Sequence, residues 1–418
     1  MRNVDIVIIG GGSAGMAAAI AAKENGVDSI LVLERSEEMG GILEQCIHNG
    51  FGLQIFKEEL TGPAFAEKLF TQLKDLGIEY QTNACVLSFD ENKILQYVSP
   101  KDGYVEVQAK AIILACGCYE RSRGAISIPG KRLKGVYTAG AAQKYLNLEN
   151  ILVGKKVFIL GSGDIGLIMA RRMTLEGAKV LGVAELMPYS NGLMRNIVQC
   201  LEDYNIPLYL SHTVKNIDGK DHVEKITIAE VDANHNFIEG SEKEFEVDCL
   251  LLSVGLIPET NLATNAGIEI DPRTKGPKVN DHLETSIKGI YACGNALHVH
   301  DLVDFVTLES KTAGKYAAND ILNSPGNNIN YIKTEASDNV GYVVPQSINT
   351  NTDDNITLSF RVRKPMKASV VEFLDGEEVI RSIKKRYLLP SEMERIVIKA
   401  DDLKKFKNSL VVRVREEI

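Results

Sequence analysis

Continuous apolar runs alternate with helix-like patterns through the first part of the chain. The runs at 4–9, 30–33 and 111–115 are typical of strands that are buried on both faces of a parallel sheet. Between the first two runs lies AGMAAAIAAKENG, whose small residues predict a helix that packs very close to a sheet and ends at an Asn-Gly pair. TGPAFAEKLFTQLKDLG, at 61–77, carries apolar residues at helical spacing and predicts a further helix. This alternation indicates an α/β fold.

The same order of elements occurs a second time. Residues 156–160 predict a strand, GSGDIG follows at 161–166, and a helix is predicted up to about Gly177. KVLGVAE at 179–185 predicts the next strand. The first copy carries GGGSAG at 10–15 in the equivalent place, so the chain contains an internal repeat.

Each copy has a GxGxxG turn between a strand and a helix, and an acid ends the following strand. The first glycine permits the tight turn, the second lets the backbone approach a pyrophosphate, and the third lets the helix pack on the strand. The helix N-terminus faces the phosphates, and the acid accepts hydrogen bonds from a ribose diol. A turn that binds nothing is the alternative for each copy, but two complete copies favour two dinucleotide sites. The residues are Gly10, Gly12, Ser13, Gly15 and Glu34 in the first copy, and Gly161, Gly163, Asp164, Gly166 and Glu185 in the second.

Two dinucleotide sites in one chain imply two dinucleotides, which is the arrangement that hydride transfer between a nicotinamide and a flavin requires. At the second turn, the carboxylate of Glu185 would repel a 2′-phosphate, and no arginine follows it until Arg195. The sequence therefore favours NADH over NADPH.

The pattern changes after about Asn330, where no helical pattern or glycine motif remains. Alternation of apolar and polar residues in NITLSFRVR and SLVVRVRE, with VVEFLDGEEVI and RIVIKA between them, predicts a small antiparallel β domain. From Arg361 on, the chain has 15 Lys+Arg and 10 Asp+Glu, so this domain concentrates positive charge in an acidic protein. We expect it to dock a partner protein, and a solvated face that merely covers the first domain is the alternative.

The 418 residues carry a net charge of -9, which argues against non-specific nucleic-acid binding because that needs an excess of basic charge. No apolar stretch approaches the ~20 residues that span a bilayer, and the N-terminus lacks a signal-peptide pattern. The seven cysteines form no CxxC pair, so we expect neither a disulfide framework nor a metal site. These features predict a cytoplasmic protein with reduced thiols.

Four further motifs resemble the flavoprotein superfamily with two dinucleotide sites that includes the pyridine nucleotide-disulfide oxidoreductases, over about residues 1–325. The resemblance makes AIILACG and CLLLSVGLIPET the crossovers between an FAD domain and an NAD domain, with Gly117 and Gly255 in them. TSIKGIYACGN would present Gly294 and Asn295 to the flavin ribityl chain, with Asn where Asp is usual. HVHDLVDF would open a helix near Val303 whose N-terminus faces the flavin pyrimidine edge.

The resemblance implies an α/β fold class with two Rossmann-like dinucleotide-binding domains, one inserted in the other, plus a small C-terminal antiparallel β domain. The FAD-binding domain would comprise 1–118 and 256–330, the NAD-binding domain 119–255, and the β domain 331–418.

The redox dithiol of the disulfide reductases is missing from both of its known positions. GVYTAGAAQ places Ala139 and Ala142 where thioredoxin-reductase-like members carry Cys-x-x-Cys. A Gly-Gly pair that ends at Gly41, which would border the FAD, is followed by the single Cys46. By resemblance to single-thiol NADH peroxidases and oxidases, Cys46 would be a redox thiol near the flavin, and a packing role is the alternative.

Histidines gather in the segments that would border the flavin. His48, His298 and His300 could handle protons there, with a structural hydrogen-bonding role as the alternative, and Cys46 and His48 are the expected catalytic residues. The other cysteines of these segments, Cys116, Cys118 and Cys293, are expected to be packing residues, with a redox pair of Cys116 and Cys118 as the alternative. Asp301 and Asp304 are expected to cap the helix that HVHDLVDF opens, and the alternative is that they face the active site.

A narrower resemblance rests on GILEQCIHNGFG, GCYERSRGAISIPG, TAGAAQ and YACGNALHVHDLVDF. These motifs are similar to the flavoprotein associated with anaerobic-type glycerol-3-phosphate dehydrogenase, to amine, proline or opine dehydrogenase subunits, and to subunits of hydrogen cyanide synthase. They imply an oligomeric, FAD-dependent NAD(P)H oxidoreductase that exchanges electrons with a partner component. Two alternatives stay open: an amine or amino-acid dehydrogenase subunit that oxidises its substrate at the FAD, and a non-catalytic flavin-binding assembly subunit.

Overall fold

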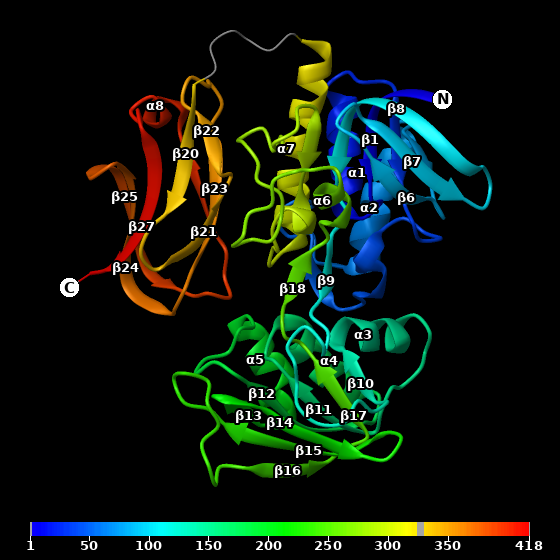
Figure 1. Ribbon diagram of the computed structural model, residues 1–418, viewed down its shortest axis with the longest axis vertical. Helices are drawn as coiled ribbons and strands as arrows, with labels where there is room; N and C mark the ends of the chain where they lie inside the picture. The colour runs from blue at the N-terminus through cyan, green and yellow to red at the C-terminus, as the bar shows by residue number, and fades with distance from the viewer. Residues whose placement is uncertain (1, 324–329, 418) are drawn as a thin grey trace. The chain divides into compact units, whose positions relative to one another are not determined.

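The computed structural model describes residues 2–323 and 330–417, and the chain divides into two compact units (Figure 1). Unit 1 combines Met1–Cys118 with Pro258–Ile418, and unit 2 is Tyr119–Ile257. The inserted unit thus ends at 257, where the motifs predict 255. The predicted C-terminal domain is not a unit of its own, and the end of the predicted 256–330 segment falls partly on 324–329, outside the described residues.

A seven-stranded mixed sheet forms the centre of unit 1. Its strands β1, β2, β5, β8 and β19 pair in parallel, and β1, β2 and β19 are largely buried, as continuous apolar runs predict. β7 pairs antiparallel with β8, and β6 pairs antiparallel with β7. The order is β5-β2-β1-β8-β7-β6, with β19 also on β8. The bounds are Arg2–Ile9 (β1), Ile30–Leu33 (β2), Glu79–Gln81 (β5), Cys85–Phe89 (β6), Ile94–Ser99 (β7), Gly103–Leu114 (β8) and Ile290–Ala292 (β19).

Two helices of unit 1 pack on each other unusually closely, α1 (Ser13–Glu24) and α7 (Val303–Leu322) (Figure 1). A Cβ at Gly314 of α7 would overlap the carbonyl oxygen of Ala18 in α1, so small residues set the distance between the helices. All of the residues from Ala14 to Ala22 are buried. The other helices of unit 1 outside the C-terminal region are α2 (Gly62–Asp75) and α6 (Asn261–Asn265).

Unit 2 repeats the core of unit 1 around a five-stranded parallel sheet of order β10-β17-β11-β12-β13. An antiparallel sheet of order β14-β15-β16 completes the unit. The strands are β10 (Val136–Thr138), β11 (Lys156–Leu160), β12 (Lys179–Glu185), β13 (Leu208–Leu210), β14 (His212–Gly219), β15 (Val223–Glu230), β16 (Lys243–Glu246) and β17 (Cys249–Leu252). The helices are α3 (Ala139–Asn147), α4 (Asp164–Leu175) and α5 (Met194–Cys200).

The C-terminal β region of unit 1 has two sheets around one apolar core that includes Phe360, Phe373 and Val412. Two expectations are corrected here. β20 (Tyr331–Ala336) pairs parallel to β27 (Ser409–Glu416), and α8 (Ala400–Leu403) is a short helix in a region without a helical pattern. The other strands are β21 (Val340–Val344), β22 (Ser347–Asn349), β23 (Ile356–Val362), β24 (Met366–Asp375), β25 (Glu378–Leu388) and β26 (Glu394–Ile398).

None of the helices in the described ranges has both the length and the apolar character that crossing a membrane requires. Short elements make up the rest of the assigned structure. The short elements are η1 (Gly41–Gln45), β3 (Asn49–Phe51), β4 (Leu60–Thr61), β9 (Cys118–Glu120), η2 (Glu202–Tyr204), β18 (Leu256–Pro258) and η3 (Gly294–Ala296).

Candidate functional site: two glycine turns and a buried carboxylate

The first glycine turn joins β1 to α1 and requires glycine at two positions. Gly10 has a φ of 111°, which residues with a side chain rarely adopt, and a Cβ there would overlap the carbonyl oxygen of Ala115. A Cβ at Gly15 would overlap the carbonyl oxygen of Gly10. The first turn of α1 therefore approaches the end of β1 as closely as two backbones can.

Glu34, directly after β2, holds this turn in place. Its side chain is buried, its Oε2 accepts a hydrogen bond from the N–H of Gly11 at 2.6 Å, and its Oε1 accepts one from Ser36 at 2.8 Å. A carboxylate oxygen has more than one lone pair, so Glu34 keeps acceptor capacity for ribose hydroxyls.

The loop that follows β2 lies beside the same turn. Gly40 donates its N–H to the carbonyl oxygen of Gly11 at 2.9 Å and forms an isolated parallel bridge with Gly12. Gly41 has a φ of 61°, and a Cβ there would lie 3.1 Å from the Cα of Gly12. The structure thus brings Gly41 to the glycine turn.

The other residues assigned to FAD from the sequence lie at the carboxyl edge of the same sheet, because the parallel strands β1, β8 and β19 all end there. A Cβ at Gly294 would lie 2.8 Å from the Cβ of Ala14 at the start of α1. Asn295 follows it, α7 begins at Val303, and Gly117 has a φ of 74° with open space where a Cβ would stand.

This turn has room and donors for a pyrophosphate. A Cβ at Gly12 would find no atom nearer than 3.9 Å, so packing within the protein does not explain the glycine. Gly12 is also the N-cap of α1 and provides no side-chain cap, which leaves the first N–H groups of the helix without a side-chain acceptor. Open space at an uncapped helix N-terminus suits a pyrophosphate. The residues present therefore fit FAD at Gly12 and Ser13.

The second glycine turn, between β11 and α4, repeats the arrangement and adds a side chain to it. Gly161 has a φ of 96°, and a Cβ there would overlap the carbonyl oxygen of Ser253. Glu185 is buried, and its Oε1 accepts a hydrogen bond from the N–H of Met187 at 2.9 Å. Its Oε2 accepts two, from the N–H of Ser162 at 2.9 Å and from the hydroxyl of Ser162 at 2.6 Å.

Ser162 and Ser253 are site residues that the sequence reasoning missed. The Oγ of Ser253 accepts a hydrogen bond from the N–H of Gly166 at 3.0 Å, and a Cβ at Gly166 would lie 2.6 Å from the Cβ of Ser253. Gly255, two residues later, has a φ of 102° and accepts a hydrogen bond from the N–H of Arg121 at 3.0 Å. A serine directly after the first glycine, and another after the apolar run CLLL, were the available signals.

An acid stands at the start of α4, where the first turn has a serine. The Oδ1 of Asp164 accepts hydrogen bonds from the N–H of Leu193 at 2.9 Å and from the side-chain amide of Asn196 at 2.6 Å. Asn191 donates its N–H to the Oγ of Ser162 at 2.9 Å. The segment at 191–196, which is the loop before α5 and the first turn of α5, therefore lies against the second turn. A carboxylate is stabilised at a helix N-terminus, but it would oppose a second anion there.

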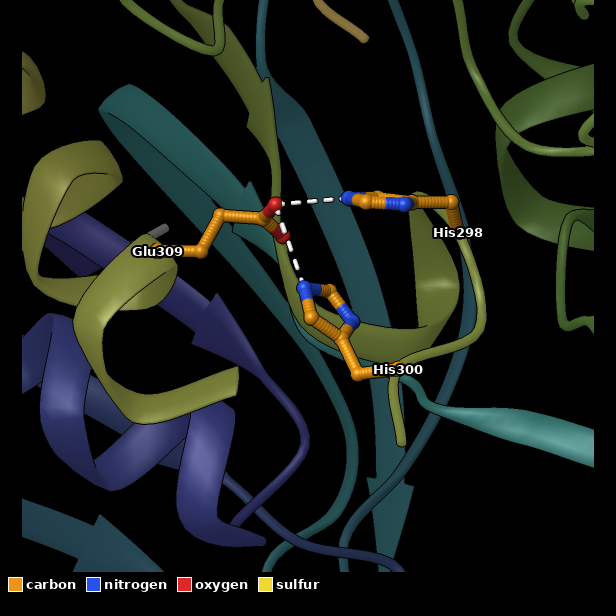
Figure 2. Close-up of side chains that lie close together, drawn as sticks. All are labelled: His298, His300 and Glu309. Carbon is orange, nitrogen blue, oxygen red and sulfur yellow. Dashed lines mark hydrogen bonds and ion pairs between the residues drawn. The ribbon is translucent and has the colours of Figure 1, made fainter. Parts of the chain in front are cut away.

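Three ionisable side chains meet between the loop before α7 and α7 itself (Figure 2). One oxygen of Glu309, Oε2, lies 2.7 Å from His298 Nε2 and 3.2 Å from His300 Nε2. The other, Oε1, accepts a hydrogen bond from the N–H of Gly294 at 2.9 Å. Burial opposes ionisation of Glu309, but the two imidazoles outweigh burial and keep the pKa of this carboxyl below its usual range. Burial lowers the pKa of His298.

Asp304, expected to cap α7, instead holds the loop after β3. Its carboxylate accepts hydrogen bonds from the backbone N–H groups of Gly52, Gln54 and Ile55 at 2.8–3.0 Å. The capping prediction is wrong because these three donors lie far away in the sequence and need a buried acceptor.

Asp301 does not cap α7 either, because the C-terminal β region binds it. Its carboxylate pairs with the guanidinium of Arg361 and accepts a hydrogen bond from the N–H of Met393 at 2.6 Å. Arg361 also donates to the carbonyl oxygen of Val299 at 3.2 Å and to the hydroxyl of Tyr342 at 3.2 Å. These contacts join the C-terminal β region to the loop before α7. They explain why the β region is part of unit 1.

The sequence pattern of the pyridine nucleotide-disulphide oxidoreductases matches residues 4–313, which include both glycine turns and the cluster of Glu309. The chain belongs to this family. The fold class predicted from the motifs is confirmed by the likeness to T. acidophilum thioredoxin reductase, with a TM-score of 0.63 at 23% identity over 77% of this chain and 100% of that chain.

Two proteins of known name are also similar to this chain in sequence. The hydrogen cyanide synthase subunit HcnB of Pseudomonas protegens is 26% identical over 289 residues, which are 64% of this chain and 60% of that protein. The NAD(P)H sulfur oxidoreductase (CoA-dependent) of Pyrococcus abyssi is 28% identical over 314 residues, 71% of this chain and 64% of that protein. The predicted resemblance to a hydrogen cyanide synthase subunit is thereby confirmed. The chain spans less than two thirds of the length of either relative.

Burial raises the pKa of three cysteine thiols of unit 1 well above neutral pH. Burial raises the pKa of Cys46 to about 12, and its thiol donates to the carbonyl oxygen of Ile42 at 3.3 Å. Burial likewise raises the pKa of Cys116 and of Cys293 to about 12. Cys118 accepts a hydrogen bond from the amide of Asn295 at 3.6 Å. Redox chemistry at Cys46 stays a prediction without support from its pKa.

The remaining predicted catalytic residue, His48, lies in the loop after η1. Its Nδ1 is 3.1 Å from the carbonyl oxygen of Asn49, and its ring lies 4.9 Å from that of Phe51. Ala139 and Ala142, which replace the family's dithiol, are both fully buried in α3.

Proposed function

We propose that the chain is an FAD-dependent NADH oxidoreductase, with FAD at the glycine turn of unit 1 and NAD(H) at the glycine turn of unit 2. FAD would supply the ring that exchanges a hydride with the nicotinamide. The observation that carries the proposal is the repeat: each unit has a set of parallel strands, a GxGxxG turn, and a buried glutamate that binds the backbone of that turn. Membership in a family of pyridine nucleotide oxidoreductases supports the same chemistry.

In unit 1, the N–H groups at Gly12 and Ser13 would bind the pyrophosphate of FAD, and Glu34 would accept hydrogen bonds from its ribose. The amide of Asn295 would orient the ribityl chain. The N-terminus of α7 would present its positive dipole end to the flavin.

In unit 2, Glu185 supports NADH as the preferred nucleotide. Its buried carboxylate would accept a hydrogen bond from a ribose hydroxyl and repel a 2′-phosphate. No lysine or arginine occurs from Leu186 to Met194 that could pair with such a phosphate.

The test is the rate at which each nicotinamide bleaches the bound flavin without oxygen. We expect heat-released FAD at about one per chain, and faster bleaching by NADH than by NADPH. Glu185→Ser removes the ribose acceptor and the repulsive charge, so the ratio of the two rates should approach one, whereas the exposed Glu202→Ser in the same unit should keep the ratio. Equal rates in the unaltered protein would contradict the role of Glu185.

We also propose that a partner protein exchanges electrons with this chain through the C-terminal β region. HcnB is described as a subunit, which supports a complex. In the described sheet, β25 is an outer strand, and Lys384, Arg386 and Tyr387 are exposed on it. Lys384→Glu with Arg386→Glu should weaken partner binding more at low salt than at high salt and leave bleaching by NADH unchanged. Unchanged co-purification would reject this surface.

Two finer parts of the proposal need their own tests. A link to glycerol-3-phosphate metabolism predicts anaerobic bleaching by glycerol-3-phosphate or transfer of electrons to a dehydrogenase that uses it. Bleaching by an amine or amino acid in the absence of NADH would favour the dehydrogenase alternative, and bleaching by none of these would favour an assembly subunit.

A further inference from the structure

The cluster around Glu309 has the geometry of a ligand set (Figure 2). The Nε2 atoms of His298 and His300 and one carboxylate oxygen of Glu309 all lie within 4.8 Å of one another. The side chains are shielded from solvent, with exposed fractions of 1% for each histidine and 10% for Glu309. The sequence predicts no metal site, because its seven cysteines are scattered and form no CxxC pair.

The hydrogen bonds of His300 show which of its nitrogens carries a proton. Asn295 Oδ1 accepts the backbone N–H of His300 at 3.0 Å, which fixes the amide oxygen on this side. The same oxygen lies 3.3 Å from His300 Nδ1, so Nδ1 must be the donor in that bond.

This assignment leaves two acceptors face to face. A neutral imidazole with its proton on Nδ1 has a lone pair on Nε2, and His300 Nε2 lies 3.2 Å from Glu309 Oε2. A carboxylate oxygen is also an acceptor, so the pair requires a positive charge between them. That charge is either a proton, on the imidazole or on the carboxyl group, or a metal ion.

We propose that His298, His300 and Glu309 bind a divalent transition-metal ion of the zinc class. Two imidazoles and one carboxylate are a donor set that Zn²⁺ uses, with bonds of about 2.0–2.2 Å. Ligand atoms around such an ion stand about 3.3 Å apart, so Glu309 Oε2, now 2.7 Å from His298 Nε2 and 3.2 Å from His300 Nε2, would move by roughly half an ångström to make room for it.

Outer contacts already orient two of the three ligands. The Nδ1–H of His300 is held by Asn295, and the second oxygen of Glu309 is held by the N–H of Gly294. Metal-binding histidines and carboxylates are commonly oriented by such bonds.

Guanidinium groups of the C-terminal β region disfavour a cation at this cluster. Removing one of them should therefore raise the affinity for a metal ion, whereas removing a ligand should lower it. Arg361 is paired with Asp301, whereas Arg395 lies over the ring of Phe305 at 4.4 Å and is close enough to Glu309 for the two charges to interact. Replacing Arg395 by methionine removes a positive charge near the cluster, so we expect Zn²⁺ to bind several-fold more tightly.

The experiment uses the full-length, untagged, flavin-loaded protein after treatment with a chelator. Titration with Zn²⁺ should give one tight site per chain, and zinc X-ray absorption should report nitrogen and oxygen ligands at about 2.0–2.2 Å without sulfur. Glu309→Gln and His298→Asn should abolish the tight site, and Asn295→Ser should weaken it about 10–100-fold through loss of the outer contact. His212→Asn, a buried histidine of unit 2, is the matched control and should leave it intact.

If Glu309→Gln does not fold, the unaltered protein and the Arg395→Met variant still decide the question through stoichiometry and the sign of the affinity change. Zinc bound equally by the unaltered and His298→Asn proteins, or no tight zinc at all, would overturn the proposal and leave an imidazolium–carboxylate cluster only. The readout does not involve NADH, so it stands or fails independently of the proposed oxidoreductase activity.

Discussion

The two glycine turns of this chain have the same backbone arrangement but differ in the side chains that surround it. In unit 1, the residue after the first glycine is Gly11, and the helix starts with Ser13, so the turn offers backbone N–H groups and one uncharged hydroxyl to a ligand. In unit 2, the equivalent positions are Ser162 and Asp164, and both side chains bond to the segment at 191–196. The strand orders β5-β2-β1-β8 and β13-β12-β11-β17 are otherwise equivalent.

The difference fits the proposed division between a resident ligand and an exchanging one. A turn of uncharged donors with nothing near its central glycine suits a tightly held pyrophosphate. A turn with a carboxylate at its helix N-terminus opposes an anion and favours weaker binding. This matches the proposal that FAD stays bound in unit 1 while NAD(H) enters and leaves unit 2.

The largest effect should come from adding one methyl group to the first turn. Gly15→Ala places a Cβ onto the carbonyl oxygen of Gly10, which cannot move away without distorting β1. We expect a loss of about 3 kcal/mol in the free energy of unfolding and loss of bound flavin, measured by urea unfolding and flavin content. Gly12→Ala meets no atom within 3.9 Å and should keep the fold while lowering flavin content.

The equivalent change in unit 2 sharpens the comparison. At Gly166 the nearest atom is the Cβ of Ser253 at 2.6 Å, so Gly166→Ala should cost less stability and leave the flavin in place. Equal losses from Gly15→Ala and Gly166→Ala would contradict the difference between the turns.

The two glutamates should respond alike, because each binds one backbone N–H group on each of its oxygens. Glu34→Gln leaves one of the N–H groups of Gly11 and Ser36 facing an amide N–H₂ group, at a cost of about 2 kcal/mol. Glu185→Gln leaves one of the N–H groups of Ser162 and Met187 in the same position, so we expect a similar cost. Thermal unfolding of both variants measures this, and no loss in Glu185→Gln would argue against its role in holding the second turn.

The structural repeat itself could be predicted from the sequence, because glycines at tight turns and continuous apolar strands leave local signals. The fold class and the closing glutamates follow from those signals. Ser253, the segment at 191–196 and the bonds of Asp304 could not be predicted, since each depends on a contact between residues far apart in the chain. Alternation in the C-terminal region predicts strands but not their direction, which is why the parallel pairing of β20 with β27 was missed.

The units should also differ in how pH affects their stability. Burial raises the pKa of Asp281 in unit 1 to about 7, well above its value in an unfolded chain, so the native state holds a proton that the unfolded state releases. The stability from this group is fully present below about pH 4 and is lost as the pH rises through about 7.

Asp281→Asn should therefore raise the unfolding free energy at pH 8 by about 2 kcal/mol and change little at pH 4. In unit 2, a hydrogen bond from Lys131 lowers the pKa of Asp218, so Asp218→Asn should show no such gain at pH 8. Chemical unfolding at the two pH values checks both variants, and a gain of equal size at pH 4 and pH 8 would reject the assignment to Asp281.

The smallest effect should come from exchanging the first helical residues of the two turns. Asp164→Ser removes the carboxylate from the start of α4, and NADH should bind a few-fold more tightly. Ser13→Asp introduces one in unit 1, and flavin retention should fall by a similar factor. Fluorescence titration and flavin release rates measure the two changes, and weaker NADH binding by Asp164→Ser would show that its bonds to Leu193 and Asn196 matter more than its charge.

The most direct test of the two-turn account is an anaerobic titration of the purified, flavin-containing protein with NADH and, separately, with NADPH. The account predicts that about one equivalent of NADH bleaches one FAD per chain, and that NADPH does so more slowly. A flavin that neither nicotinamide bleaches, or one that proves to be FMN, would contradict the assignment of the two turns to FAD and NADH.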